Sequence, residues 1–219
     1  KFKNLYAQIY LKENAPKKAQ KIFKEILSID PNNIDAILNY SSVLIQNKCF
    51  LEAKSVLEKA IAFYQDVPGI WTNLGILYYE ENNFIKSIEC DEHSIKIDPK
   101  NYIPYYNIGR SYYKLSKYEE SIQYLKKSLE INPQHSKSYL NLGCAFDKIG
   151  AIDLAIINFL TAIKLKSNYE DARFNLGRCY LAIDKYKNGW REYEFRPSAR
   201  KLYKRINNIN KIWNGKKTS

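Results

Sequence analysis

The tripeptide Asn-Leu-Gly occurs at Asn73-Leu74-Gly75, Asn141-Leu142-Gly143 and Asn175-Leu176-Gly177, and Asn107-Ile108-Gly109 occupies the interval between the first two. Neighbouring copies are 34 residues apart, with no insertion. A fixed period of this length indicates an array of stacked structural repeats. Continuing the period in both directions predicts six units, followed by a segment of different character. The predicted boundaries are 1–33, 34–67, 68–101, 102–135, 136–169 and a diverged sixth unit at 170–197, with the last segment at 198–219.

Each unit contains two apolar patterns with helical spacing. In the third unit, Trp71, Leu74 and Tyr78 lie one turn apart, and Ile88 and Ile95 continue the pattern in a second helix. Spacings of three and four keep such residues on one helix face. Asp-Pro or Asn-Pro follows the second helix in three of the units, where proline cannot continue a helix. The sequence therefore predicts an all-α solenoid of helix pairs.

Glycine recurs at one register of the first helix, at Gly75, Gly109, Gly143 and Gly177. Glycine inside a helix costs about 1 kcal/mol relative to alanine, so its recurrence predicts a close crossing of the two helices in each pair. Asp91 stands where other units have an apolar side chain. We expect a locally loosened hairpin there, and a functional carboxylate is the alternative.

This pattern resembles the tetratricopeptide repeat over roughly residues 1–196. The resemblance implies a right-handed superhelix whose first helices line a concave groove. Arg173 departs from the pattern, because it replaces an aromatic or aliphatic residue.

The resemblance places one asparagine of each unit towards the groove. A carboxamide donates and accepts hydrogen bonds at once, so a column of them would pair with the backbone of an extended peptide. The column is similar to that in the repeat domain of O-linked N-acetylglucosamine transferases. Asparagine is also a frequent choice at this position in the repeat generally, which leaves a purely structural role open. The predicted ladder consists of Asn39, Asn73, Asn107, Asn141 and Asn175.

Further groove positions are aromatic and basic in the later units. Arginine and lysine favour an acidic peptide or a terminal carboxylate. A chaperone-type carboxylate clamp is the alternative ligand mode, and a self-assembling structural role is a second alternative. These positions are Tyr106, Arg110, Tyr113 and Lys114 in the fourth unit, Lys137 in the fifth, and Phe174 and Arg178 in the sixth.

The C-terminal part is strongly basic. Of the net charge of +12, residues 185–219 carry +9, with 11 Lys/Arg and 2 Asp/Glu. Residues 189–196, Gly-Trp-Arg-Glu-Tyr-Glu-Phe-Arg, followed by Trp213-Asn214-Gly215, resemble the joint in bacterial proteins where such repeats precede a glycosyltransferase domain. The resemblance implies that the module presents acceptor proteins to that domain. Residues 198–219 also predict a basic capping helix, able to meet an anionic membrane surface, whereas we do not expect nucleic acid as a partner.

No motif for catalysis, a metal or a cofactor occurs. The sequence lacks the glycine-rich phosphate loops and the nucleophile elbow, and His93 and His135 stand 42 residues apart. The four cysteines have no metal-ligand spacing, which favours free thiols in a reducing compartment and predicts a cytoplasmic protein. No apolar run approaches the roughly 20 residues of a membrane helix. The chain begins at Lys1, not at methionine, so we expect it to be a piece of a longer protein. We expect no catalysis within this piece, and a glycosyltransferase activity stays open for the full-length protein.

Overall fold

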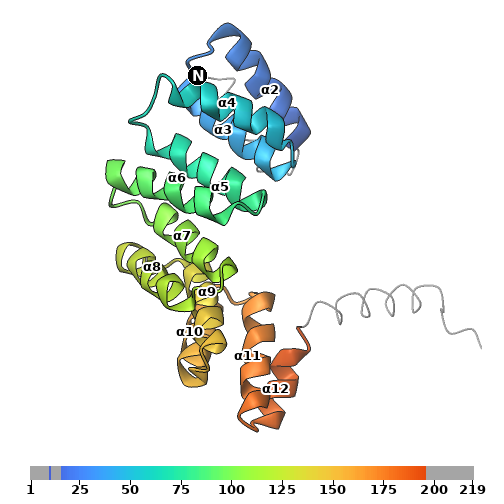
Figure 1. Cartoon of the computed structure of the whole chain (residues 1–219). Helices are drawn as coiled ribbons and strands as arrows, with labels where there is room; N and C mark the ends of the chain where they lie inside the picture. The colour runs from blue at the N-terminus through green and yellow to red at the C-terminus, as the bar shows by residue number, and fades with distance from the viewer. Residues whose placement is uncertain (1–9, 11–15, 196–219) are drawn as a thin grey trace, which may run out of the picture. The chain divides into compact units, whose positions relative to one another are not determined.

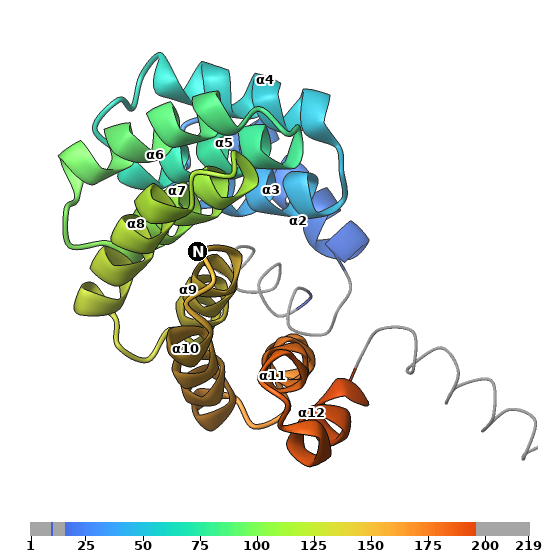
Figure 2. The same ribbon diagram turned by 60° about the horizontal axis from the view of Figure 1, so that its bottom comes forward.

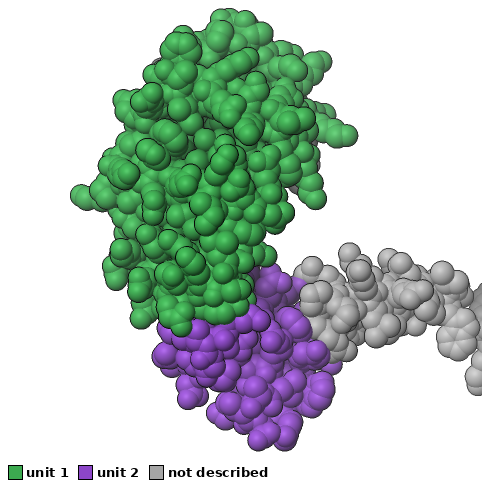
Figure 3. Space-filling view, in the orientation of Figure 1, with its two compact units in different colours: residues 1–131 green, residues 132–219 purple. Residues whose placement is uncertain are grey.

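Antiparallel helix pairs follow one another along the chain in the computed structural model, which describes Tyr10 and residues 16–195 (Figure 1). The predicted helix 198–219 lies outside the described residues, which contain no β-strand. The chain divides into two compact units, residues 1–131 and residues 132–219 (Figure 3). The helices of unit 1 are α2 (Pro16–Ile29), α3 (Ile34–Gln46), α4 (Phe50–Ile61), α5 (Pro68–Glu80), α6 (Phe84–Ile97), α7 (Tyr102–Lys114) and α8 (Tyr118–Ile131). Those of unit 2 are α9 (Ser136–Lys148), α10 (Ile152–Leu165), α11 (Glu170–Ala182) and α12 (Tyr186–Tyr193).

The turn inside each helix pair has the same backbone geometry. Its central residue has a positive φ of about 60°, and in one case 78°, which is the left-handed conformation that ends helices. The residues concerned are 34 apart, so the turn repeats with the sequence period. Glycine supplies this conformation without strain only in α9–α10. The five residues are Lys48, Asn82, Ser116, Gly150 and Asp184.

The recurring glycines allow the two helices of a pair to cross closely, as predicted. A Cβ atom added at Gly109 would lie 2.7 Å from the Leu125 side chain, and one at Gly143 would lie 2.6 Å from the Phe159 ring. Both contacts are shorter than packed atoms tolerate. The second helix of each pair therefore occupies the space that a side chain on the first helix would need.

The first helices of unit 1 form one layer and the second helices form the other. α5 contacts both α3 and α7, and Figure 2 shows α4, α6 and α8 along the opposite side. Between the layers lies an apolar core that includes the fully buried Phe23, Leu44, Leu57 and Leu77. In unit 2, α10 packs against α9 and α11. This arrangement gives unit 1 a face made only of first helices.

Candidate functional site

The three predicted asparagines of unit 1 lie on first helices, and each has a different environment. Asn39 is half-buried and donates from Nδ2 to the backbone oxygen of Asp35, at 2.8 Å, in its own helix. Asn73 reaches back to the preceding repeat, where Nδ2 donates to Leu38 O and to Ser41 Oγ, both at 2.9 Å. Both amide hydrogens of Asn73 are thereby used. Asn39 and Asn73 keep a carboxamide oxygen that accepts no hydrogen bond from the described residues.

Asn107 is buried, with 5% of its surface exposed, and bonds within the protein. Its Nδ2 donates to Asp91 Oδ1 at 3.1 Å. An amide enclosed in this way joins α7 to α6 and has little surface left for a ligand. The sequence register could not reveal this partner, because Asp91 belongs to a different helix of the preceding repeat.

Asp91 does not loosen the α5–α6 hairpin, contrary to expectation. The side chain is 0% exposed, and its Oδ2 would lie 2.8 Å from a Cβ atom at Gly75, so the two helices cross as closely as in the neighbouring pairs. Oδ2 has no hydrogen-bond partner. Burial holds the pKa of Asp91 well above its usual range, against the opposing effects of the Asn107 hydrogen bond and the positive charge of Arg110.

Arg110 is the best-placed cation on the first-helix face of unit 1. Its guanidinium carbon lies 4.0 Å from the ring centroid of Tyr79 in α5 and 5.5 Å from that of Tyr106 in α7. Within the described part of the chain, no carboxylate forms an ion pair with it. The side chain is only half-buried, so the donors of the guanidinium edge remain open to a ligand. Sequence reasoning found Arg110 but missed Tyr79, whose register the ladder does not include.

The other predicted residues of α7 lie at its C-terminal end. The ring of Tyr113 meets Tyr118 of α8 edge-on, with centroids 5.5 Å apart, so it packs across the turn of its own hairpin. Lys114 is exposed in the last turn of the helix. Lys114 therefore adds positive charge one turn from Arg110 without being held in place.

In unit 2 the predicted residues of α11 already have partners within the protein. Asn175 donates from Nδ2 to Asp171 O at 2.9 Å, and its Oδ1 accepts from Arg178 at 3.4 Å. Arg178 also forms an ion pair with Asp147 at 3.7 Å. The Phe174 ring packs against Tyr193 of α12, with centroids 5.3 Å apart. Asn141 is half-buried and Lys137 is exposed. Because Arg178 already has a carboxylate partner, unit 2 offers a weaker anion site than Arg110.

The first residues of the C-terminal motif, Gly189 and Trp190, have packing roles in the structure. A Cβ at Gly189 would lie 2.6 Å from the Leu181 side chain, and Trp190 meets Tyr193 edge-on at 5.8 Å. The unusual Arg173 donates to Glu192 Oε2 at 2.9 Å, which ties α11 to α12. Residues 196–219, which hold the rest of the motif, lie outside the described residues.

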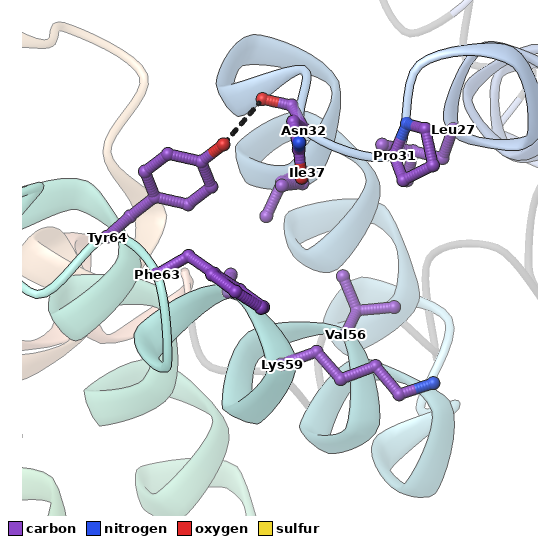
Figure 4. A pocket seen from close by; sticks show the side chains of 9 residues that line it. Leu27, Pro31, Asn32, Ile37, Val56, Lys59, Phe63 and Tyr64 are labelled. Carbon is purple, nitrogen blue, oxygen red and sulfur yellow. Dashed lines mark hydrogen bonds between the residues drawn. The ribbon is translucent and has the colours of Figure 1, made fainter.

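An apolar pocket of about 380 Å³ lies where α2, α3 and α4 meet (Figure 4). The side chain of Tyr64 borders it and donates to Asn32 O at 3.3 Å, and Phe63 beside it is 78% exposed. Lys59 supplies the only charged side chain of the lining. This pocket lies at the ends of the helices, and none of the predicted groove residues lines it.

Residues 16–195 and Tyr10 contain no group of three or more His, Cys, Asp or Glu side chains arranged for a metal ion. Among the same residues, no helix is both long and apolar enough to cross a membrane. All four cysteines are free thiols.

Models of the tetratricopeptide repeat match residues 10–72, 68–101, 102–135 and 136–169, which together cover most of the chain. The chain belongs to the tetratricopeptide repeat family. The pairs α5–α6, α7–α8 and α9–α10 fall within the matches at 68–101, 102–135 and 136–169, and α11–α12 follows the last of them.

Solved structures of tetratricopeptide repeat proteins share the fold. The chain is 19% identical to PilW, a type IV pilus biogenesis factor, with a TM-score of 0.81 over 92% of this chain and 97% of that one. It is 16% identical to PilF of Pseudomonas aeruginosa, with a TM-score of 0.75 over 87% and 86% of the two chains. YrrB, described as having an unusual peptide-binding site, is 16% identical, with a TM-score of 0.60 over 79% and 89%. At these identities the likeness establishes the fold alone.

Proposed function

We propose that the chain is a protein-interaction scaffold, and that the first-helix face of unit 1 binds an extended acidic peptide. The observation that carries the proposal is the Arg110 guanidinium, stacked on Tyr79 and without an ion-pair partner in the described chain. A guanidinium fixed over an aromatic ring keeps its edge free for a bidentate contact to a carboxylate. A glutamate or aspartate of the peptide is the group that this site fits.

The carboxamides of the same face bind the peptide backbone in this proposal. The Nδ2 atoms of Asn39 and Asn73 already donate to backbone oxygens of α3, so each side chain offers its Oδ1 as an acceptor. Such acceptors pair with peptide N–H groups and add affinity without reading the sequence. Asn107 has no part in this contact because Asp91 holds it in the interior.

Charge supports an acidic partner as well. The chain carries a net charge of +12, of which residues 185–219 hold +9, so the long-range attraction of anionic partners comes mostly from the C-terminal part and not from unit 1. Burial keeps Asp91, the carboxyl that acts electrostatically on Arg110, biased towards its neutral form. Neutral Asp91 leaves the charge of Arg110 available to the ligand.

Fluorescence anisotropy tests this function with a dye-labelled glutamate-rich decapeptide and a matched glutamine-rich decapeptide. We expect the glutamate peptide to bind more tightly, and Arg110→Ala to weaken it by about 10-fold or more, as the loss of a charged hydrogen bond implies. Lys114→Ala is the matched control and should change the affinity far less, because a mobile surface charge contributes little. Equal binding of the two peptides, or an unchanged affinity of Arg110→Ala, would contradict the proposal.

The chaperone-type clamp makes a different prediction for the same assay. A clamp depends on the terminal carboxylate, so amidation of the peptide C-terminus would abolish binding. Our proposal places an acidic side chain at Arg110, and amidation should then change affinity only slightly.

The prediction of a following glycosyltransferase domain stays a proposal. Residues 189–195 have packing roles in unit 2 that account for them without a second domain. Sequencing the gene beyond the codon of Ser219 tests it, since a Rossmann-like domain there would support the recruiting role.

The free cysteines are in keeping with the proposed cytoplasmic location.

A further inference from the structure

The outward face of α10 carries an apolar stripe at three consecutive turns. Leu154, Ile157 and Leu160 are 46%, 58% and 46% exposed although they are large aliphatic side chains. The inward residues of the same helix, such as Phe159, are completely buried. Packing in the core of unit 2 therefore does not explain why the outward positions are apolar.

The repeat register provides an internal comparison. One period earlier, in α8, the equivalent positions hold Glu120, Gln123 and Lys126, and α4 and α6 also have polar residues at all three. The apolar stripe is thus a property of α10 and not of second helices in general. Other second helices expose single large apolar residues, such as Ile85 in α6, whereas of the described second helices only α10 exposes three on consecutive turns, and a contiguous apolar patch of this kind marks a site of interaction.

Two charged residues flank the stripe on the same helix face. Asp153 lies in the first turn of α10 and Lys164 in the last, and both are exposed. At 100° per residue, both project within about 40° of Ile157, which is the centre of the stripe. Along the helix, this face therefore presents a negative charge, then the apolar stripe, and then a positive charge.

We propose that this face binds the same face of a second copy of the chain, with the two α10 helices antiparallel. Centring two copies on Ile157 superimposes their apolar stripes and brings each Asp153 opposite residue 161 of the other helix. Lys164 lies about 4.5 Å beyond that position, and helical side chains lean towards the N-terminus, so its ammonium reaches the carboxylate. A patch that is its own complement is the requirement for a two-fold symmetric dimer.

The area available implies weak association. A single helix face buries less than the roughly 1,200 Å² of a stable interface, so we expect a dissociation constant of about 0.1–1 mM. A surface of this kind brings two peptide-binding units together when the chain is concentrated or tethered. The dimer does not depend on the peptide function of unit 1, and its test uses no peptide.

Sedimentation equilibrium of the 219-residue chain between 10 µM and 1 mM tests the proposal. The weight-average mass should rise from 25.7 kDa towards the mass of two chains. The triple variant Leu154→Glu, Ile157→Gln and Leu160→Lys gives α10 the surface of α8 and should remain monomeric. Ile85→Gln removes an equally exposed isoleucine, 54% exposed, from α6 and should behave as wild type. A monomeric wild type at 1 mM, or a triple variant that associates equally well, would overturn the dimer.

Charge reversal at Asp153 and Lys164 gives a second test, because both side chains are exposed and the fold tolerates their substitution. Lys164→Asp alone places two acids opposite each other and should weaken association several-fold. Adding Asp153→Lys restores complementary pairs and should recover it. Failure of the double variant to recover, with circular dichroism showing an intact helix content, would refute the antiparallel arrangement.

Discussion

Replacing Asp91 with asparagine tests whether the structure holds this buried carboxyl in its neutral form. The side chain is fully buried, has one hydrogen bond, from Asn107, and has an Oδ2 without a partner. Burial raises the pKa of Asp91 in the folded state, whereas the unfolded chain keeps the ordinary value of about 3.9. The unfolded state therefore loses its proton first as the pH rises.

The sign and size of the effect follow from linkage. The contribution of Asp91 to stability is complete below pH about 3.9 and is lost as the pH rises from there through the folded-state pKa. Each pH unit in this window costs at most about 1.4 kcal/mol, so the largest total loss by pH 7 is about 4 kcal/mol. The asparagine side chain of D91N cannot ionise, so the variant does not lose this free energy of unfolding as the pH rises. Its added amide hydrogens shift its stability by an amount that does not depend on pH.

Urea unfolding of wild type and D91N at pH 4, 5, 6 and 7 measures the effect. We expect the variant to gain stability relative to wild type across this range, with the steepest gain between the unfolded-state pKa and the folded-state pKa of Asp91. Asp66→Asn, which changes an exposed carboxylate, is the control and should show no such trend. Parallel curves for D91N and wild type would refute the assignment of a neutral, buried Asp91.

Three further predictions concern packing and accessibility. Gly177→Ala should cost about 1–3 kcal/mol in urea unfolding, because its Cβ would lie 2.6 Å from the rigid backbone N of Tyr193, while Gly69→Ala should cost less, because its Cβ would meet the flexible end of the Leu38 side chain at 3.1 Å; equal midpoints would contradict this. Glu192→Gln should lower stability by about 1–3 kcal/mol, because the half-buried guanidinium of Arg173 loses its charged partner, and an unchanged thermal midpoint would count against the ion pair. Iodoacetamide should label Cys49 before the other three thiols, whose pKa burial raises to about 12, and peptide mapping that finds another cysteine labelled first would disprove it.

The sequence predicted the helix pairs well because their determinants repeat. Glycine at the crossing and Pro after the second helix act locally, so their register alone fixes where helices approach and where they end. Thus α6 ends at Ile97, before Asp98-Pro99, as expected. The left-handed turn residue also recurs every 34 positions, although only Gly150, Asn82 and Asp184 are of residue types that favour this conformation.

The site was harder to predict because its partners lie outside the repeat register. Asn107 and Asn73 share one position, yet Asn107 is buried by an acid of the preceding second helix while Asn73 bonds to the preceding first helix. The pairing of Arg178 with Asp147 likewise joins neighbouring repeats. A column of identical residues does not show which of them face solvent, because neighbouring repeats differ at the surrounding positions.

The stripe on α10 shows the opposite case, in which a signal in the sequence was present. Aligning the outward positions of the second helices separates Leu154, Ile157 and Leu160 from their polar equivalents without coordinates. The structure adds that these side chains are exposed, which periodicity alone cannot tell from a fully buried helix.

Peptide titration followed by NMR shows directly whether Arg110 contacts an acidic peptide. The Nε–Hε signal of Arg110 reports on the guanidinium, and the Nδ2 signals of Asn39 and Asn107 report on two amides that the structure places differently. We expect a large, saturable shift of the Arg110 signal with the glutamate-rich decapeptide, a smaller shift of Asn39, and none of Asn107. An unmoved Arg110 signal at saturating peptide, or a shift confined to residues of unit 2, would contradict this expectation.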